Sequence, residues 1–349
     1  MSVFSALDFD DHEKVTFFYD KKTGLKAIIA IHSTKRGPAL GGCRIWPYVD
    51  EQQAITDALR LSRAMTYKAA MANLPFGGGK TVIIGDSHRD KTPELFRALG
   101  RCVEQLNGYY MKRLRGCYIV SEDVGTSVED MAFIHETTFN VVGLPDGSGD
   151  PSPFTAIGVY ESIRAAVTYG LKRNSLQGTK VAIQGLGHVG YSLAKLLAEV
   201  GAKLIITDID LNLVEKVAQE LNATYVSPDD IYSVDADVFA PCALGAILND
   251  KTIPQLKCKI IAGSANNQLE RHDHGETLAK MKILYAPDYV VNAGGLIDVS
   301  YEGPDYNAEI VRHHVEGIHD TLLDVFLRAE TLQISTSEAA DLIAEERLK

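Results

Sequence analysis

A glycine-rich hexapeptide at residues 185–190 is the first candidate for chemistry in this sequence. It follows the apolar residues Val181-Ala182-Ile183 and opens a segment that favours helix. Glycines at these spacings permit a tight turn, close approach of the backbone to a pyrophosphate, and close packing of helix on strand. The hexapeptide therefore predicts a dinucleotide site made of Gly185, Leu186, Gly187, His188, Val189 and Gly190.

Asp208 supports this prediction because it ends the next strand-like segment. In dinucleotide sites a carboxylate about 20 residues beyond the glycines accepts hydrogen bonds from the adenosine ribose. Such a carboxylate also repels a 2′-phosphate, and the neighbouring residues, Lys203 included, offer no arginine to replace it. We therefore expect NAD rather than NADP. The alternative is a glycine turn that binds no ligand.

Lys80 ends a second glycine run, Gly77-Gly78-Gly79. The letters GGGKT resemble a phosphate-binding loop, but that motif needs a glycine six residues before the lysine and a helix after it. Here Leu74 occupies the first position, and residues 81–86 predict a strand. Lys80 therefore needs another role.

Two further charged residues accompany Lys80. Lys68 lies near the end of residues 51–72, which predict a helix, and Asp123 follows the strand-like residues 117–120. Taken alone, Lys68 is explained as a cation at a helix C-terminus and Asp123 as a turn former. Beside a nicotinamide site, however, the three residues suit amino-acid oxidation. One lysine holds an α-carboxylate, and the other lies on glycines that let backbone and substrate approach closely.

The chain of 349 residues is long enough for two domains, and the helix- and strand-like segments around these residues predict that both are α/β. Residues 1–142 are expected to form a mixed α/β substrate and catalytic domain, completed by a C-terminal helix at about 328–349. Residues 150–327 are expected to form a Rossmann-type, doubly wound NAD-binding domain. The glycine- and proline-rich residues 143–153 are the candidate linker.

Individual segments support this division. Residues 25–32 predict another strand, and residues 180–210 have the pattern strand, glycine turn, helix, strand of a βαβ unit. Near the C-terminus, Ser335 lies three residues before Glu338, which predicts a capping box at the start of a closing helix.

Composition restricts the class of protein. The net charge of −11 argues against nucleic-acid and anionic-membrane partners. No apolar run approaches the roughly 18 residues that span a bilayer, and the N-terminal residues lack the pattern of a signal peptide. The five cysteines never form a CxxC pair. We therefore expect a reduced, cytoplasmic protein without a metal.

Ten motifs resemble the glutamate/leucine/phenylalanine/valine dehydrogenase family, specifically its leucine and phenylalanine branch. They run in order along nearly the whole chain. They are GPALGGCRIWPY (37–48), DALRLSRAMTYKAA (57–70), FGGGKTVIIGD (76–86), FRALGR (96–101), SEDVGT (121–126), PSPFTAIGV (151–159), GLGHVG (185–190), APCALGA (240–246), IAGSANNQL (261–269) and YAPDYVVNAGGL (285–296).

The resemblance implies reversible oxidative deamination of an L-amino acid to a 2-oxo acid and ammonium, with NAD as cofactor, by a homo-oligomer. It implies that Lys68 holds the substrate carboxylate, that Lys80 activates water, and that Asp123 shuttles protons to and from the amino nitrogen. The remaining implied contacts are Gly41, Gly42 and Asn267 to the substrate, Thr155 and Asn266 near the nicotinamide, and Ala243 and Leu244 along the cofactor. Cys242 belongs to the same cofactor segment as a packed small residue rather than a nucleophile.

The resemblance also implies an apolar substrate side chain, walled by Leu40, Met65, Leu296 and Val299. Leu40 disfavours glutamate, because glutamate enzymes of the family have a lysine there. Ser121, two residues before Asp123, matches neither the alanine of aliphatic enzymes nor the glycine of phenylalanine enzymes. Because serine is bulkier than glycine, we expect leucine, valine or isoleucine, with phenylalanine as the alternative. A non-catalytic NAD sensor is the alternative from another class.

One segment departs from the family pattern. Residues 109–117 are about eight residues longer than in the leucine enzymes, and they include Lys112, Arg113 and Arg115. This cluster is interpreted as a solvated loop rather than a ligand clamp. The residues His272 and His274 resemble metal ligands, but no other ligand cluster accompanies them in the sequence.

Overall fold

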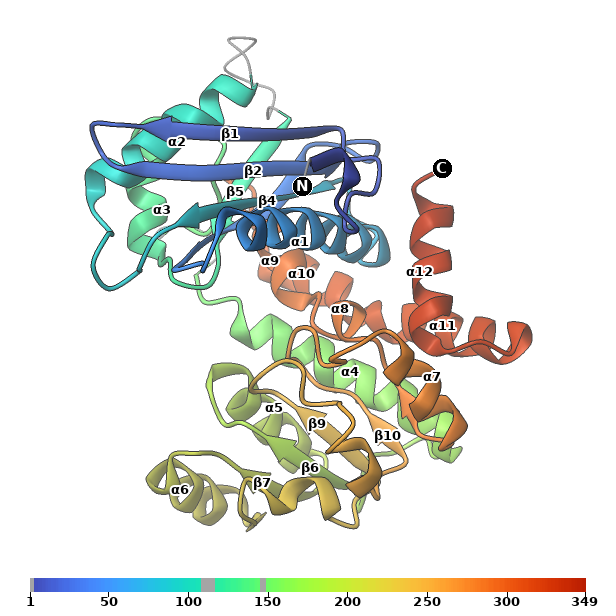
Figure 1. The fold of residues 1–349 in the computed structure, drawn as a ribbon. Helices are drawn as coiled ribbons and strands as arrows, with labels where there is room; N and C mark the ends of the chain where they lie inside the picture. The colour runs from blue at the N-terminus through green and yellow to red at the C-terminus, as the bar shows by residue number, and fades with distance from the viewer. Residues whose placement is uncertain (1–2, 108–116, 145–148) are drawn as a thin grey trace. The chain divides into compact units, whose positions relative to one another are not determined.

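The chain folds into two compact units, which a computed structural model describes for residues 3–107, 117–144 and 149–349 (Figure 1). The first unit comprises Met1–Gly149, Val299–Tyr306 and Arg347–Lys349, and the second comprises Asp150–Asp298 and Asn307–Glu346. The expected segment 109–117 lies outside the described residues except for Cys117. The functional roles expected for residues 1–142 and 150–327 stay predictions.

The first unit is built on a five-stranded mixed sheet with the order β1-β2-β4-β3-β5. Strands β1 and β2 pair antiparallel, as do β2 and β4, whereas β3 is parallel to both β4 and β5. The bounds are β1 Lys14–Asp20, β2 Leu25–Ser33, β3 Ala39–Trp46, β4 Gly77–Ile84 and β5 Tyr118–Glu122. Strands β2, β3 and β4 are buried along nearly their whole length, so both faces of the sheet are covered.

Helix α1 (Glu51–Met71) packs on β2 and β4 from one face, while α2 (Pro93–Asn107) and α3 (Val128–His135) cover the other (Figure 1). Asp50 caps α1 by accepting a hydrogen bond from the Gln53 N–H. Ser127 and Asp130 form a capping box at the start of α3. The helix expected at 51–72 is therefore present.

The glycine run before Lys80 is part of a strand and not a turn, which differs from the expected start at residue 81. Strand β4 begins at Gly77, and close neighbours on both faces explain the glycines. A Cβ on Gly78 would lie 2.0 Å from the Thr66 backbone nitrogen on α1, and one on Gly79 would lie 2.6 Å from the Tyr118 ring. Only glycine lets helix and ring approach the strand this closely.

The second unit is built on a six-stranded parallel sheet with the order β11-β10-β9-β6-β7-β8. Counted from β6, this is the 3-2-1-4-5-6 order of a Rossmann fold. The bounds are β6 Lys180–Gln184, β7 Lys203–Thr207, β8 Thr224–Tyr225, β9 Val238–Pro241, β10 Ile260–Ile261 and β11 Leu284–Tyr285. The prediction of a two-domain α/β fold with a doubly wound domain is confirmed.

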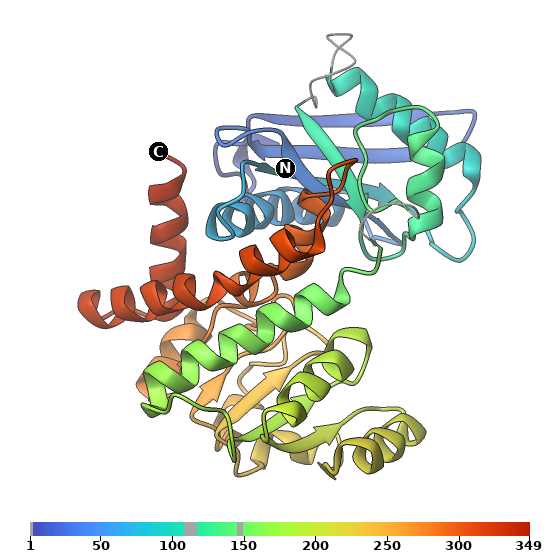
Figure 2. The same ribbon diagram turned by 180° about the vertical axis from the view of Figure 1, so that it is seen from behind.

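Helices cover this second sheet, and Figure 2 shows α4 (Ser152–Leu171) and α5 (His188–Glu199) side by side on one of its faces. The other helices are α6 Leu211–Leu221, α7 Asp273–Lys280, α8 Asp288–Val291, α9 Gly294–Ser300, α10 Ala308–Glu316, α11 Ile318–Leu332 and α12 Thr336–Arg347, with short 3-10 turns at Val3–Ser5, Asp230–Ser233 and Ile253–Gln255. Among the residues that the structure describes, no helix is both long and apolar enough to cross a membrane.

Most of the C-terminal helix α12 belongs to the second unit and not, as expected, to the first. Ser335 does accept a hydrogen bond from the Glu338 N–H, as the capping pattern predicts. The segment 328–349 was expected to complete the first unit, but only Arg347–Lys349 group with it. The rest of α12 is held in the second unit, because Asp341 accepts a hydrogen bond from Tyr289 and Glu346 pairs with Arg328.

Two buried histidines of the first unit lie edge to face, with their ring centroids 4.9 Å apart. His12 Nε2 is 3.0 Å from the Leu59 carbonyl oxygen, and His32 Nδ1 is 2.9 Å from Thr66 Oγ1. Burial, assisted by the neighbouring His12, lowers the pKa of His32 to about 4. Both rings are therefore neutral near pH 7.

We predict that His32→Asn reduces the acid sensitivity of the fold. An unfolded His32 binds a proton below about pH 6.5, whereas the folded one does so only below about 4. Acidification across this interval therefore favours the unfolded state, by at most about 3 kcal/mol. The urea denaturation midpoint, followed from pH 7.5 to 4.5, should fall less in the variant than in the wild type. His313→Asn, at an exposed histidine, is the control and should follow the wild type. Identical slopes for His32→Asn and wild type would contradict this account.

Candidate active site

A buried ion pair between Lys80 and Asp123 lies at the centre of the candidate site. Lys80 Nζ is 2.8 Å from Asp123 Oδ2, and only 5% of the lysine side chain is exposed. Lys80 comes from the middle of β4, and Asp123 follows the last residue of β5. The structure therefore brings together two of the three charged residues that the sequence predicted for catalysis.

Strand alternation determines which face the pair occupies. Residues two apart on a strand share a face, so Leu40, Gly42 and Arg44 of β3 lie on one face of the first sheet. Cys43 and Ile45 lie on the other and pack in the core beneath α2 and α3. The first face is the one on which α1 packs, because Gly78 and Val82 of β4 contact that helix.

Gly42 leaves the space that the ion pair occupies. A Cβ at this position would lie 2.7 Å from Asp123 Cβ and 3.2 Å from Lys80 Nζ. Its neighbour Gly41 is required for a different reason, since a Cβ there would lie 1.7 Å from the Gly79 carbonyl oxygen. Gly41 therefore allows two strands to pack, whereas Gly42 makes room for the Lys80–Asp123 pair.

Backbone and side-chain contacts fix the position of Asp123. Its N–H donates to Thr126 Oγ1 at 3.0 Å, and that hydroxyl lies 2.8 Å from the Cys43 carbonyl oxygen. Burial alone would raise the pKa of Asp123, but the adjacent Lys80 and Arg44 outweigh it, and the pKa lies below its ordinary value. Asp123 is therefore a carboxylate at neutral pH.

The other substrate residues predicted in the first unit lie on the same elements. Leu40 is buried on β3 and pairs with Ile119 of β5, and Gly42 pairs with Ser121. Met65 and Lys68 are partly buried in the last turns of α1. Leu296 and Val299 both belong to α9, but they fall on opposite sides of the division between the units. Their role in a side-chain pocket stays a prediction.

The glycine hexapeptide lies where the strand order of the second sheet reverses. It follows β6, and the segment Cys242-Ala243-Leu244 follows the adjacent strand β9. Gly185 has φ +97°, and a Cβ on it would lie 2.8 Å from Ala243 Cβ. Loops at the carboxyl ends of strands that flank such a switch point form the ligand crevice of open α/β sheets.

The hexapeptide has the geometry that a pyrophosphate requires. A Cβ on Gly190 would lie 1.9 Å from the Gly185 carbonyl oxygen, so this glycine keeps the turn tight, whereas a Cβ on Gly187 would meet nothing within 4 Å. No side chain caps the N-terminus of α5, which begins at His188. Open space beside uncapped N–H groups fits a dinucleotide phosphate.

Asp208 connects this loop to the next strand. Its Oδ2 accepts a hydrogen bond from the Leu186 N–H at 2.6 Å, and its Oδ1 accepts one from the Asp210 N–H at 3.0 Å. Each carboxylate oxygen has a second lone pair for a ribose hydroxyl. The residues present therefore fit NAD, with Asp208 at the ribose and Gly187 at the pyrophosphate.

Further predicted residues, Leu244 and Asn266 for the cofactor and Asn267 for the substrate, lie in the loops after β9 and β10. Leu244 is 76% exposed at the rim of its loop. Asn267 has φ +51°, and Asn266 Oδ1 accepts a hydrogen bond from Asn292 Nδ2 at 2.8 Å. Thr155 Oγ1 donates to the Pro151 carbonyl oxygen in the first turn of α4. These loops belong to the second unit, as does the hexapeptide.

The sequence prediction missed Arg44 and Asp57, which extend the Lys80–Asp123 pair. Arg44 Nε lies 2.9 Å from Asp123 Oδ2, and Arg44 Nη1 lies 3.0 Å from Asp57 Oδ2. The alternation of residues 40, 42 and 44 along one strand was the available signal.

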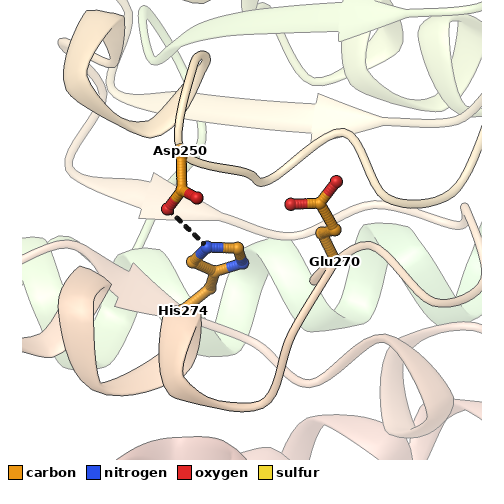
Figure 3. Close-up of side chains that lie close together, drawn as sticks. All are labelled: Asp250, Glu270 and His274. Atoms are coloured by element: carbon orange, nitrogen blue, oxygen red, sulfur yellow. Dashed lines mark hydrogen bonds and ion pairs between the residues drawn. The ribbon is translucent and has the colours of Figure 1, made fainter.

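Asp250, Glu270 and His274 have ligand atoms close enough to suggest a metal site (Figure 3). Their contacts favour an arginine-centred ion-pair network instead. Arg271 binds both oxygens of Asp250 and lies 3.7 Å from Glu270. His274 Nδ1 accepts the Arg271 backbone N–H, so Nε2 carries the proton that it donates to Asp250, and no ring nitrogen is left for a cation.

Two family profiles match the chain. One, described as "Glu/Leu/Phe/Val dehydrogenase, dimerisation domain", matches residues 12–140. The other, "Glutamate/Leucine/Phenylalanine/Valine dehydrogenase", matches residues 147–216 and 206–323. Together they cover most of the chain.

Full-length relatives agree with these profiles. A leucine dehydrogenase of Thermoactinomyces intermedius is 52% identical over 352 residues, which span 100% of this chain and 94% of the relative. A phenylalanine dehydrogenase of Caldalkalibacillus thermarum is 47% identical, spanning 99% and 94%. The crystal structure of L-tryptophan dehydrogenase from Nostoc punctiforme superposes with a TM-score of 0.85 at 47% identity, covering 97% of this chain and 96% of the other.

Proposed function

The chain belongs to the Glu/Leu/Phe/Val dehydrogenase family, and from this premise we propose that it oxidatively deaminates a branched aliphatic L-amino acid with NAD. The products are the 2-oxo acid and ammonium, and the reaction is reversible. The Lys80–Asp123 pair beside Gly42 is the observation that carries the proposal, because an amine and a carboxylate in direct contact are groups that could transfer protons to and from a substrate. The family resemblance drawn from the sequence motifs is confirmed.

We propose the following roles for the residues of the first unit. Lys68 binds the substrate carboxylate as a cation, with Gly41 and Gly42 beneath the substrate. Bound NAD supplies the chemistry of hydride acceptance at the substrate Cα. Lys80 removes a proton from the water that attacks the resulting imine carbon. Asp123 takes a proton from the substrate ammonium before hydride loss and returns one to the nitrogen of the carbinolamine that the water forms. The C–N bond then breaks, the departing ammonia takes the hydroxyl proton of the carbinolamine, and the 2-oxo acid and ammonium leave. The proton that Lys80 took from water is the net proton released.

The contact between Lys80 and Asp123 supports the proposed roles of these two residues in proton transfer. Lys80 Nζ and Asp123 Oδ2 are 2.8 Å apart, close enough for a proton to pass between the two groups during the reaction. Lys80 is shielded from bulk water and Asp123 is partly shielded, which strengthens electrostatic interactions with a charged transition state. A non-catalytic NAD sensor would have no need for this pair, so the enzyme is the better proposal.

The first unit supports an apolar substrate. Leu40 lies on the same face of β3 as Gly42, two residues before it, and is only 1% exposed. Its apolar side chain offers no cation that could bind a second carboxylate of the substrate. Ser121, opposite Gly42, occupies more space than glycine and narrows the room for a ring. The 52% identity to a leucine dehydrogenase supports the same choice, while the phenylalanine and tryptophan enzymes at 47% keep an aromatic substrate as the second candidate.

We also propose that the enzyme is a cytoplasmic homo-oligomer that binds neither nucleic acid nor membranes. The profile that matches residues 12–140 is described as a dimerisation domain, which supports self-association. All five cysteines are unpaired thiols, which is consistent with a reducing compartment.

We predict a preference for leucine, valine and isoleucine over aromatic amino acids. The measurement is kcat/KM with NAD for these three substrates and for phenylalanine, tryptophan and glutamate. One methylene of pocket fit is worth only about 1–3 kcal/mol, so aromatic substrates should retain some activity. An aromatic preference above about tenfold, or 1.4 kcal/mol, would contradict the aliphatic assignment. A preference for glutamate would contradict the argument from Leu40.

We further predict that Asp208→Asn shifts cofactor preference toward NADP. The amide oxygen can still accept the Leu186 N–H, but the charge that repels a 2′-phosphate is gone. The ratio of kcat/KM for NADP to that for NAD should rise by about tenfold or more, equivalent to 1.4 kcal/mol. Asp210→Asn, which retains the cap of α6, is the matched control and should change the ratio less. Equal use of the two cofactors by the wild type would show that Asp208 does not select NAD.

A further inference from the structure

A chain of polar contacts leads from the candidate site to Asp57 on α1 and to Tyr48, which precedes that helix. Tyr48 donates its hydroxyl to Asp57 Oδ2 at 2.9 Å, and the same oxygen accepts from Arg44 Nη1 at 3.0 Å. Arg44 Nε then donates to Asp123 Oδ2 at 2.9 Å, where Lys80 Nζ also binds. All five residues belong to the first unit.

Arg44 bridges two carboxylates with separate N–H groups. Its side chain is 20% exposed and that of Asp57 is 17% exposed, so water screens these contacts only in part. A planar guanidinium holds two carboxylates in a fixed geometry, which a lysine ammonium cannot reproduce. Asp57 is itself held by Tyr48 on the same oxygen and by Arg60 on the other.

The contacts of Asp123 are unequal. Lys80 and Arg44 both bind Oδ2, whereas Oδ1 makes no hydrogen bond or ion pair with any residue that the structure describes. Two cations, Lys80 and Arg44, thus hold the Asp123 carboxylate through the same oxygen. The second oxygen is left for a group that enters the site.

We infer that Arg44, backed by Asp57 and Tyr48, is a positioning residue that holds Asp123 by Oδ2 so that Oδ1 meets the amino nitrogen of the substrate. This inference rests on the proposed function, because it assigns the free oxygen to the nitrogen that is lost as ammonium. Arg44 touches neither the substrate nor the cofactor in this account. It acts through Asp123 alone.

Arg44 also affects the pKa of Asp123 through its positive charge. The charged groups that face Asp123 are Lys80 from β4 and Arg44 from β3, while the buried thiol of Cys43 interacts with it only electrostatically, from the other face of the sheet. Those that face Arg44 are Asp123, Asp57 from α1 and Tyr48. Burial raises the pKa of Asp123, and both cations oppose that rise, so removal of Arg44 should let the pKa increase.

The test compares Arg44→Gln, Arg44→Lys and Tyr48→Phe with the wild type in kcat, KM and the pH dependence of kcat/KM. For Arg44→Gln we expect kcat to fall about 10- to 100-fold, because a misplaced catalytic group costs that much. The KM for leucine should change by less than about threefold if Arg44 does not touch substrate. The acidic limb of kcat/KM, which reports groups of the free enzyme, should move to higher pH.

Arg44→Lys separates charge from geometry. Lysine restores a cation beside Asp123, so the acidic limb should return toward that of the wild type, while kcat stays low because lysine cannot bridge both carboxylates. Tyr48→Phe removes one contact to Asp57 and should lower kcat by a smaller factor. Arg60→Gln removes the exposed arginine on the other oxygen of Asp57 and is the matched control, with wild-type values expected.

Three results would overturn the inference. The first is wild-type kcat and pH dependence in Arg44→Gln. The second is full wild-type kcat in Arg44→Lys, which also decides the question if Arg44→Gln does not fold. The third is a wild type that oxidises no amino acid, which refutes the proposed function as well. An active wild type with unchanged Arg44 variants refutes only the positioning role.

Discussion

Burial of the Lys80 ammonium is the constraint on which the first unit depends. A charged group with 5% of its side chain exposed needs a partner, since an unpaired buried charge would cost several kcal/mol. Asp123 supplies that partner from a strand that is distant in sequence. The pair fits only because Gly42 has no side chain, and Lys80 can lie inside a strand only because Gly78 and Gly79 admit α1 and Tyr118. Chemistry and packing therefore depend on the same glycines.

In the second unit, the site proposed for the cofactor offers backbone N–H groups rather than a cation to a pyrophosphate. The strand order of the unit's parallel sheet reverses between β6 and β9, and the two loops that follow these strands meet at Gly185 and Ala243. Uncapped N–H groups at α5 face the space left open by Gly187. Asp208 holds the loop through the Leu186 N–H and keeps a lone pair on each oxygen for ribose. Backbone geometry, rather than side-chain charge, thus makes this site suitable for NAD.

Sequence patterns correctly predicted those elements that are determined by residues close together in the sequence. The helix at 51–72, the βαβ unit at 180–210 and the cap at Ser335 are present because capping residues and apolar periodicity act over a few residues. Contacts between distant segments were not predictable in this way. Strand β4 was expected to start at residue 81, and only the packing of α1 and Tyr118 explains why it includes Gly77-Gly78-Gly79. Nothing local to Arg44 indicates its contact with Asp123, which depends on the pairing of β3 with β5. The grouping of α12 depends likewise on Tyr289 and Arg328, far away in sequence.

The central claim is that the Lys80–Asp123 pair performs proton transfer and does not merely stabilise the fold. The most direct test is kcat of Lys80→Ala with leucine, together with the Kd for NAD measured by fluorescence titration. Arg44 still pairs with Asp123 in this variant, so no carboxylate is left without a cation. The account predicts that kcat falls about 10²–10⁴-fold, the usual contribution of a general base, while the Kd for NAD stays at its wild-type value. Near-normal kcat in a folded Lys80→Ala protein would contradict it.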